Sequence, residues 1–134
     1  MDMPASHGVT ERCRKMSGVL TIVGDKWTVM IVMVLIERPR RFNEIKRLIG
    51  GISQQMLTRT LKALERDGMV SRTVHPTVPP QVEYALTDLG HSLSRPLRDL
   101  GEWAGAHLEQ ILGNRVRYDI RKDQGDLARS QTSG

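Results

Sequence analysis

The 134-residue sequence contains a single cysteine, Cys13, and this scarcity excludes two classes of structure at once. One thiol cannot form an intrachain disulfide, and it cannot supply a cysteine-rich zinc site. The four histidines, His7, His75, His91 and His107, show no spacing typical of metal ligands. The sequence therefore predicts no metal site, and nothing in it indicates a bound cofactor.

Long apolar runs are also missing. A membrane-spanning helix needs about 18 or more apolar residues, and the most apolar segment, residues 28–36, is too short. The N-terminus has no charged region leading into an apolar one, so no signal peptide is predicted. We therefore expect no membrane partner and a reducing, cytoplasmic location, which also suits the lone cysteine.

Aromatic residues make up only 4% of the chain, so leucine, isoleucine, valine and methionine must supply most of the core. A chain of this length fits one domain with a core of modest size. It also lacks a nucleophile–base pair, a glycine-rich phosphate loop and paired carboxylates in a plausible cleft. An enzyme is therefore not predicted.

Positive charge, by contrast, is abundant and localised. The formal net charge is +5, and the pI is about 9.9. Residues 38–81 carry nine Lys and Arg against three acidic residues, a net +6, whereas the rest of the chain has a net charge of −1. This concentration indicates one anion-binding face rather than a generally basic surface.

A helix predicted from Ser53 to Asp67 lies in this basic segment. Leu57, Leu61 and Leu64 form one apolar stripe at helical spacing, and Ser53 is suited to cap the helix start. The opposite face carries only polar and basic side chains: Gln54, Gln55, Thr58, Arg59 and Lys62. Glutamine and arginine can pair with adenine and guanine edges in the major groove of DNA. Taken alone, this pattern also fits an ordinary solvated helix.

The surrounding segments favour the DNA interpretation. We predict helices over Cys13–Val23, Lys26–Ile36 and Asn43–Ile49, a strand stub at residues 40–42, a turn at residues 50–51, strands over Met69–Val74 and Gln81–Leu86, and a last helix from Thr87 to residues 113–114, kinked or divided at Pro96. Two helices joined by a glycine turn and followed by a hairpin form a helix-turn-helix with a wing. The Pro-rich loop at residues 75–80 then joins the two wing strands.

Several motifs, in the same order, resemble those of the HxlR-type transcriptional regulators, a MarR-related winged helix-turn-helix family. They are Gly24–Thr28, Arg41–Ile45, Gly51–Thr58, Leu61–Val70, Val78–Tyr84 and Leu86–Gly90. The resemblance implies a mainly α (α+β) fold with N- and C-terminal dimerisation helices over residues 13–113. We expect a flexible arm at residues 1–12 and a polar, disordered tail at residues 114–134.

The resemblance also implies a homodimer that binds an inverted-repeat operator in double-stranded DNA. We expect a repressor rather than an activator. The predicted recognition helix contacts DNA through Ser53, Gln54, Gln55, Thr58, Arg59 and Lys62. The expected backbone and wing contacts are Lys26, Arg40, Arg41, Arg72, His75 and Gln81, where Gln81 replaces a basic residue usual in the family. The expected dimer interface contains Met16, Leu20, Leu100, Trp103, Leu108 and Ile111.

Cys13 is a candidate sensor. It is flanked by Arg12, Arg14 and Lys15, and nearby positive charge favours the thiolate, which is the reactive form. Some relatives sense oxidants, quinones or aldehydes through a cysteine at this place. Two interpretations stay open, a sensor of oxidants or electrophiles and an inert thiol packed at the dimer interface. A small-molecule effector is a further alternative.

A second class of function stays open as well. Winged helices also serve as protein-interaction modules that do not bind specific DNA, because a fold does not determine a function. The basic residues around the helix from Ser53 to Arg66 favour the DNA-binding regulator. Loss of affinity with salt separates the two, since phosphate contacts are salt-sensitive and an apolar protein interface is not.

Overall fold

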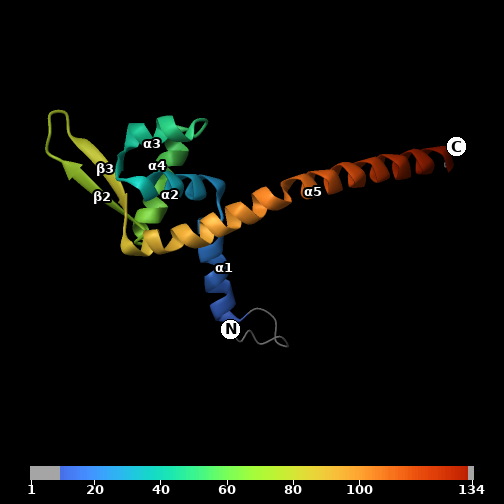
Figure 1. Cartoon of the computed structure of the whole chain (residues 1–134), viewed down its shortest axis with the longest axis horizontal. Helices are drawn as coiled ribbons and strands as arrows, with labels where there is room; N and C mark the ends of the chain where they lie inside the picture. Colours follow the sequence, from blue (N-terminus) through green and yellow to red (C-terminus); the bar gives the residue numbers. More distant parts are fainter. Residues whose placement is uncertain (1–9, 133–134) are drawn as a thin grey trace. The chain divides into compact units, whose positions relative to one another are not determined.

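The computed structural model describes residues 10–132. Its elements, in order, are α1 (Glu11–Val23), α2 (Lys26–Glu37), β1 (Arg40–Arg41), α3 (Phe42–Ile49), α4 (Gln54–Arg66), β2 (Val70–His75), β3 (Gln81–Leu86) and α5 (Asp88–Thr132) (Figure 1). The chain forms two compact units that meet between Arg95 and Pro96, inside α5. Mostly helical, with one small sheet, the architecture is the predicted winged helix-turn-helix.

The core of the first unit is built from the apolar sides of α2 and α4. Ile31, Val32 and Leu35 of α2 are at most 2% exposed. Leu57 and Leu61 of α4 are at most 1% exposed, as the predicted leucine stripe requires. Burial of each such side chain contributes about 1.5–3 kcal/mol to folding. The same burial fixes which side of α4 remains outside.

The apolar composition of α2 also bears on membrane insertion. Within residues 10–132, no single helix is both long and apolar enough to cross a membrane. Only α1 and α2 taken together, bent by 65° at their junction, would meet that criterion. Several residues of α2 lie in the protein core instead.

Glycines and a serine set the geometry of the helix-turn-helix. Gly50 and Gly51 adopt φ values of +54° and +81°, in a region that residues with a Cβ seldom occupy. The Ser53 hydroxyl then accepts a hydrogen bond from the Met56 N–H at 3.0 Å and caps α4, as predicted. Gly68, with φ +76°, turns the chain from the end of α4 into β2. The turn and caps fix the direction in which α4 leaves α3.

The wing is a three-stranded antiparallel sheet with strand order β1-β3-β2. β2 pairs with β3 from Val70 opposite Leu86 to His75 opposite Gln81. The strand stub β1 pairs Arg40 with Tyr84 on the other edge of β3. The first wing strand begins at Val70, one residue later than the sequence predicts, because the Met69 N–H and carbonyl bond to Leu64 and Thr87 instead.

The start of α5 is fastened to the turn before β2. The Thr87 hydroxyl accepts a hydrogen bond from the Gly90 N–H at 3.2 Å, which confirms Thr87 as the predicted cap. The Thr87 N–H donates to the Met69 carbonyl oxygen at 3.0 Å. Gly90 packs directly against the same carbonyl, because a Cβ built on Gly90 would lie 2.1 Å from that oxygen. No side chain fits there without a backbone shift.

We therefore expect Gly90→Ala to destabilise the protein by about 2 kcal/mol or more, since overpacking against backbone forces the helix away from the turn. The measurement is the free energy of unfolding in urea. Gly18→Ala in α1 is the matched control, because a Cβ at Gly18 meets no atom within 4 Å. An alanine at position 90 as stable as the control variant would contradict this packing.

Two helix starts differ from the predictions. α1 begins at Glu11 rather than Cys13, because the Thr10 hydroxyl accepts the Cys13 N–H at 3.2 Å and caps the helix. The predicted arm therefore ends earlier, and residues 1–9 lie outside the described range. α3 begins at Phe42, so Asn43 lies inside the helix and is not its cap. The Glu44 carboxylate instead accepts the Arg41 N–H at 3.4 Å, reaching back to the helix start.

The predicted end of the last helix is wrong. α5 continues through Gly113 and Asn114 to Thr132, so residues 114–132 are helical and not the expected disordered tail. A glycine inside a helix costs only about 1 kcal/mol relative to alanine, which neighbouring residues can offset. Beyond Asn114, opposite charges recur at steps of three and four residues, a spacing that supports a helix. Residues 133–134 lie outside the described range.

Candidate nucleic-acid interface

The outward face of α4 is one continuous polar and basic surface. Five of the six predicted recognition residues together line a single shallow hollow: Gln54, Gln55, Thr58, Arg59 and Lys62. No acidic side chain lines it. Ser53, the sixth, is exposed at the start of the helix, where its hydroxyl is used as the cap. The structure thus brings the predicted set together on the side of α4 opposite its buried leucines.

Most side chains in this hollow are available for an outside partner. Thr58 is the exception, because its hydroxyl donates to the Gln54 carbonyl oxygen at 2.8 Å. Gln55, Arg59 and Lys62 are exposed. The α4 face therefore presents amide, guanidinium and ammonium groups that can pair with base edges and phosphates.

A second hollow extends this face toward the sheet. It is lined by Thr58, Lys62 and Glu65 of α4 together with Arg72 and Tyr84. Arg72 of β2 and Tyr84 of β3 are register partners, so their side chains share one side of the sheet. Arg72 of the wing thus lies next to the C-terminal part of the α4 face, in the same hollow as Lys62.

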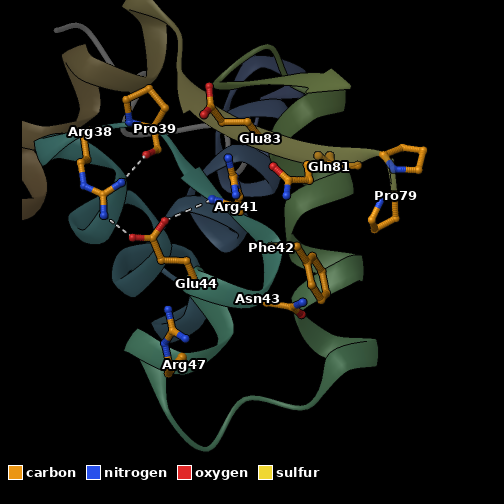
Figure 2. Close-up of a pocket in the computed structure, with 12 residues that line it drawn as sticks. Arg38, Pro39, Arg41, Phe42, Asn43, Glu44, Arg47, Pro79, Gln81 and Glu83 are labelled. Atoms are coloured by element: carbon orange, nitrogen blue, oxygen red, sulfur yellow. Dashed lines mark hydrogen bonds and ion pairs between the residues drawn. The ribbon is translucent and has the colours of Figure 1, made fainter. Parts of the chain in front are cut away.

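A larger cleft, of about 780 Å³, lies where the wing meets the start of α3 (Figure 2). Arg38 and Arg47 lie on one side of it and Pro79 on the other. Arg41 and Gln81 also line it, so two of the predicted backbone and wing residues meet here. Glu44 and Glu83 place carboxylates in the same cleft, so its charge is mixed.

Arg40 does not join the exposed cations that the sequence groups it with. Its side chain is only 10% exposed. The guanidinium donates to the Val34 carbonyl oxygen at 2.7 Å and to the Glu44 and Glu37 carboxylates at 3.0 Å each. Arg40 therefore ties the end of α2 to β1 and α3, and its hydrogen-bonding groups are used inside the protein. Carboxylates three residues before and four residues after it are the sequence signal for this role.

Glu44 is the shared acceptor of this network. Its carboxylate accepts hydrogen bonds from Arg38, from Arg40 and from the Arg41 N–H. Desolvation alone would raise the pKa of Glu44, but the hydrogen bonds from the two guanidinium groups and the N–H outweigh it and lower the pKa below its ordinary value. Glu44 thus stays ionised and holds the start of α3 next to the end of α2.

Two other predicted contacts lie apart from the α4 hollow. Lys26 is exposed at the start of α2, and its Nζ lies 4.5 Å from the centroid of the Trp27 ring. His75, in the wing, places Nε2 3.6 Å from Glu83 Oε1, close enough for an ion pair when the imidazole is protonated. Neither residue lines the surface formed by α4 and Arg72.

The residues predicted for a dimer interface leave apolar surface exposed. In α1, which has no buried residue, Leu20 is 63% exposed. In α5, Leu100, Trp103 and Leu108 are each more than half exposed, whereas Met16 and Ile111 are half-buried. Cys13 is also half-buried. Exposed leucines and a tryptophan on two helices are typical of surfaces that pack against another chain.

Comparison with known proteins gives one consistent answer. A family model described as HxlR-like helix-turn-helix matches residues 22–112. The HTH-type transcriptional regulator YtfH of Escherichia coli K12 is 42% identical over 97 residues, covering 72% of this chain and 77% of that protein. The solved structure of the regulator YtfH from Salmonella typhimurium has a TM-score of 0.70 and 40% identity, covering 79% of this chain and 94% of that one. The redox regulator HypR in its reduced form has a TM-score of 0.67 and 36% identity, covering 72% and 96%.

Proposed function

Because the chain belongs to the HxlR-like helix-turn-helix family of transcriptional regulators, we propose that it is a homodimer that binds inverted-repeat DNA and represses transcription. The observation that carries the proposal is the outward face of α4, where five polar and basic side chains form one surface without an acid. It is not an enzyme, as its family and relatives are regulators.

In the proposed complex α4 lies in the major groove. Gln54, Gln55 and Arg59 are exposed near the N-terminal half of the helix, which is the part that reaches base edges in helix-turn-helix proteins. Glutamine pairs with adenine through two hydrogen bonds, and arginine pairs with guanine in the same way. Lys62 lies two turns after Gln55 and suits a phosphate at the groove edge.

The remaining exposed cations are proposed to hold the DNA backbone. Arg72 lies beside the α4 face, and Arg41 lies in the cleft at the base of the wing with Gln81. Lys26 and His75 are more peripheral candidates for phosphate contacts. Arg40 is left out of this set, because its guanidinium is bonded inside the protein. Contacts of this kind position a protein on DNA without reading the sequence.

Dimerisation is proposed through the exposed apolar residues of α1 and the first half of α5. Leu20, Leu100, Trp103 and Leu108 are each at least half exposed in the single chain. A symmetric dimer would bury them and place two α4 helices about 34 Å apart, one turn of DNA. Repression is the proposed outcome, because a dimer seated in two successive major grooves blocks other proteins from the same DNA.

A salt titration tests DNA binding itself. We expect the affinity for a duplex containing the binding site to fall by about 10³-fold or more between 50 and 200 mM salt, if six or more phosphates are contacted. Fluorescence anisotropy of a labelled duplex measures it. An affinity that does not change over this range would contradict the proposal and would favour a protein-interaction module.

We also propose that Cys13 senses oxidants or electrophiles. In support, it is half-buried on α1, next to the proposed interface, and HypR is described as a redox regulator. Oxidation of a thiol at an interface would rotate the two α4 helices relative to each other, and a small change in their spacing weakens binding to both half-sites.

The expected result is that a thiol oxidant or a quinone lowers DNA affinity at least tenfold in the native protein and leaves Cys13→Ser unaffected. Anisotropy with and without the oxidant, followed by a reductant, measures both proteins. Release of DNA by the serine variant under oxidant would remove Cys13 as the sensor, while the proposed DNA binding would stand.

A further inference from the structure

The second half of α5 lies outside the part of the chain that the family shares. The family match ends at Leu112, but the helix continues to Thr132. Large apolar side chains of this extension are strongly exposed: Val116 is 58%, Ile120 51% and Leu127 61% exposed. The family match therefore does not account for the exposed apolar residues of this extension.

These apolar residues form a stripe. Starting from Leu112, steps of four, four and seven residues reach Val116, Ile120 and Leu127. On a helix with 3.6 residues per turn, these steps keep all four side chains within about a quarter of the circumference. An isolated helix of about 20 residues is marginal in water, and Gly113 and Gly125 weaken this one further. Although the extension continues α5, a partner that covers the stripe would stabilise it.

The charges beside the stripe identify that partner. Along one edge, Arg115, Asp119, Lys122 and Asp126 alternate in sign at steps of four, three and four residues. Read from the C-terminal end, the same series has the opposite sign at each place. A second copy of the same helix running antiparallel thus meets each charge with its opposite. In a parallel pair the same edges lie on opposite sides of the contact, so this charge series does not meet itself.

We propose that residues 113–132 pair antiparallel with the same segment of a second copy, with a two-fold axis near Ile120. This contact between the two helices is called the seam below. In this register Leu112 packs against Leu127 of the other copy. Arg115 faces Asp126, and Asp119 faces Lys122. Asp123, which interrupts the stripe, lies level with Arg117 of the other copy, whose guanidinium donates to Asn114 Oδ1 at 2.6 Å in the single chain. The two-fold axis repeats this pair, and polar pairs inside an apolar seam cost stability and fix the register, as in coiled coils.

This seam is separate from the dimer interface of the proposed function. Residue 105 lies fifteen residues before Ile120, about 22 Å along the helix, so the two copies in the seam hold their residues 100–111 far apart. Those residues stay available to a different copy. If the proposed dimer forms as well, both extensions of one dimer pair with those of a second dimer, and the closed assembly holds four copies and two DNA-binding faces.

Site-directed disulfides test the direction and register of the seam in the full chain, with Cys13→Ser as background. Ile120→Cys lies on the axis and is expected to cross-link to its own copy under mild oxidation. Arg121→Cys, a quarter-turn away from the stripe, is the control and is expected to stay uncross-linked. Arg115→Cys and Asp126→Cys are expected to cross-link when mixed and not alone. Equal cross-linking at positions 120 and 121 would overturn the proposal.

Charge exchange tests the pairing without cysteine. One variant carries Arg115→Asp with Lys122→Asp, and the other carries Asp119→Lys with Asp126→Lys. By light scattering we expect four copies in the native protein, two in each variant, and four again when the variants are mixed. This experiment separates the seam from the dimer. Native protein and variants that all hold two copies would overturn the seam and leave the dimer standing. A native dimer with monomeric variants would support the seam and contradict the dimer at residues 100–111.

Discussion

Replacing Gln55 and Arg59 by alanine, singly, is expected to weaken binding to a duplex that contains the binding site by about 10- to 100-fold each. A bidentate contact to a base contributes about 1–3 kcal/mol, and both side chains are exposed on the same α4 face. Loss of a base contact removes affinity for the operator more than affinity for unrelated DNA. Anisotropy with operator and scrambled duplexes measures the two affinities and their ratio.

Arg95→Ala is the matched control for charge. Arg95 is exposed near the start of α5 and lines neither hollow of the candidate interface. Arg95→Ala removes one positive charge, as Arg59→Ala does, so a general electrostatic effect would weaken DNA binding by both variants equally. If Arg95→Ala loses as much operator affinity as Arg59→Ala, the α4 face does not read the DNA.

Arg40→Ala is expected to lose about 1–3 kcal/mol of folding free energy, the cost typical of leaving a hydrogen-bond acceptor inside the protein without its donor. The substitution leaves the Val34 carbonyl oxygen without its donor and removes one of the two guanidinium groups bound to Glu44. Urea unfolding followed by circular dichroism measures the loss. A lysine at this position does not restore it fully, because an ammonium group cannot reproduce the guanidinium geometry.

The neighbouring arginine provides the control for this experiment. Arg41 is exposed and lines the cleft at the base of the wing. We expect Arg41→Ala to change stability by less than about 0.5 kcal/mol while lowering DNA affinity. The two adjacent arginines thus separate folding from binding. Equal stability of the two variants would show that the Arg40 network contributes nothing to the fold.

The outward face of α4 is the part of the structure that the sequence predicts best. Buried leucines at helical spacing determine which side of α4 faces the core, so the positions of Gln55 and Arg59 outside follow directly. The cap at Ser53 and the turn glycines are local features, and they too can be predicted from neighbouring residues.

The role of Arg40 is harder to predict, because the burial of its side chain depends on the packing of α2 against α3. In the sequence Arg40 stands among exposed cations, and only the fold brings the Val34 carbonyl oxygen and the Glu44 carboxylate to its guanidinium. The prediction of where α5 ends is wrong for a related reason. A glycine followed by polar residues usually ends a helix, and the opposing preference comes from charge spacing spread over many residues.

The central claim is that this chain reads DNA sequence as a two-fold symmetric assembly. Selection of bound duplexes from a random DNA library by the purified, reduced protein tests it most directly. We predict enrichment of an inverted repeat whose half-sites are centred about one helical turn apart, about 34 Å. Retention of duplexes without any common sequence would contradict the claim, and the α4 face would then be a non-specific anion-binding surface.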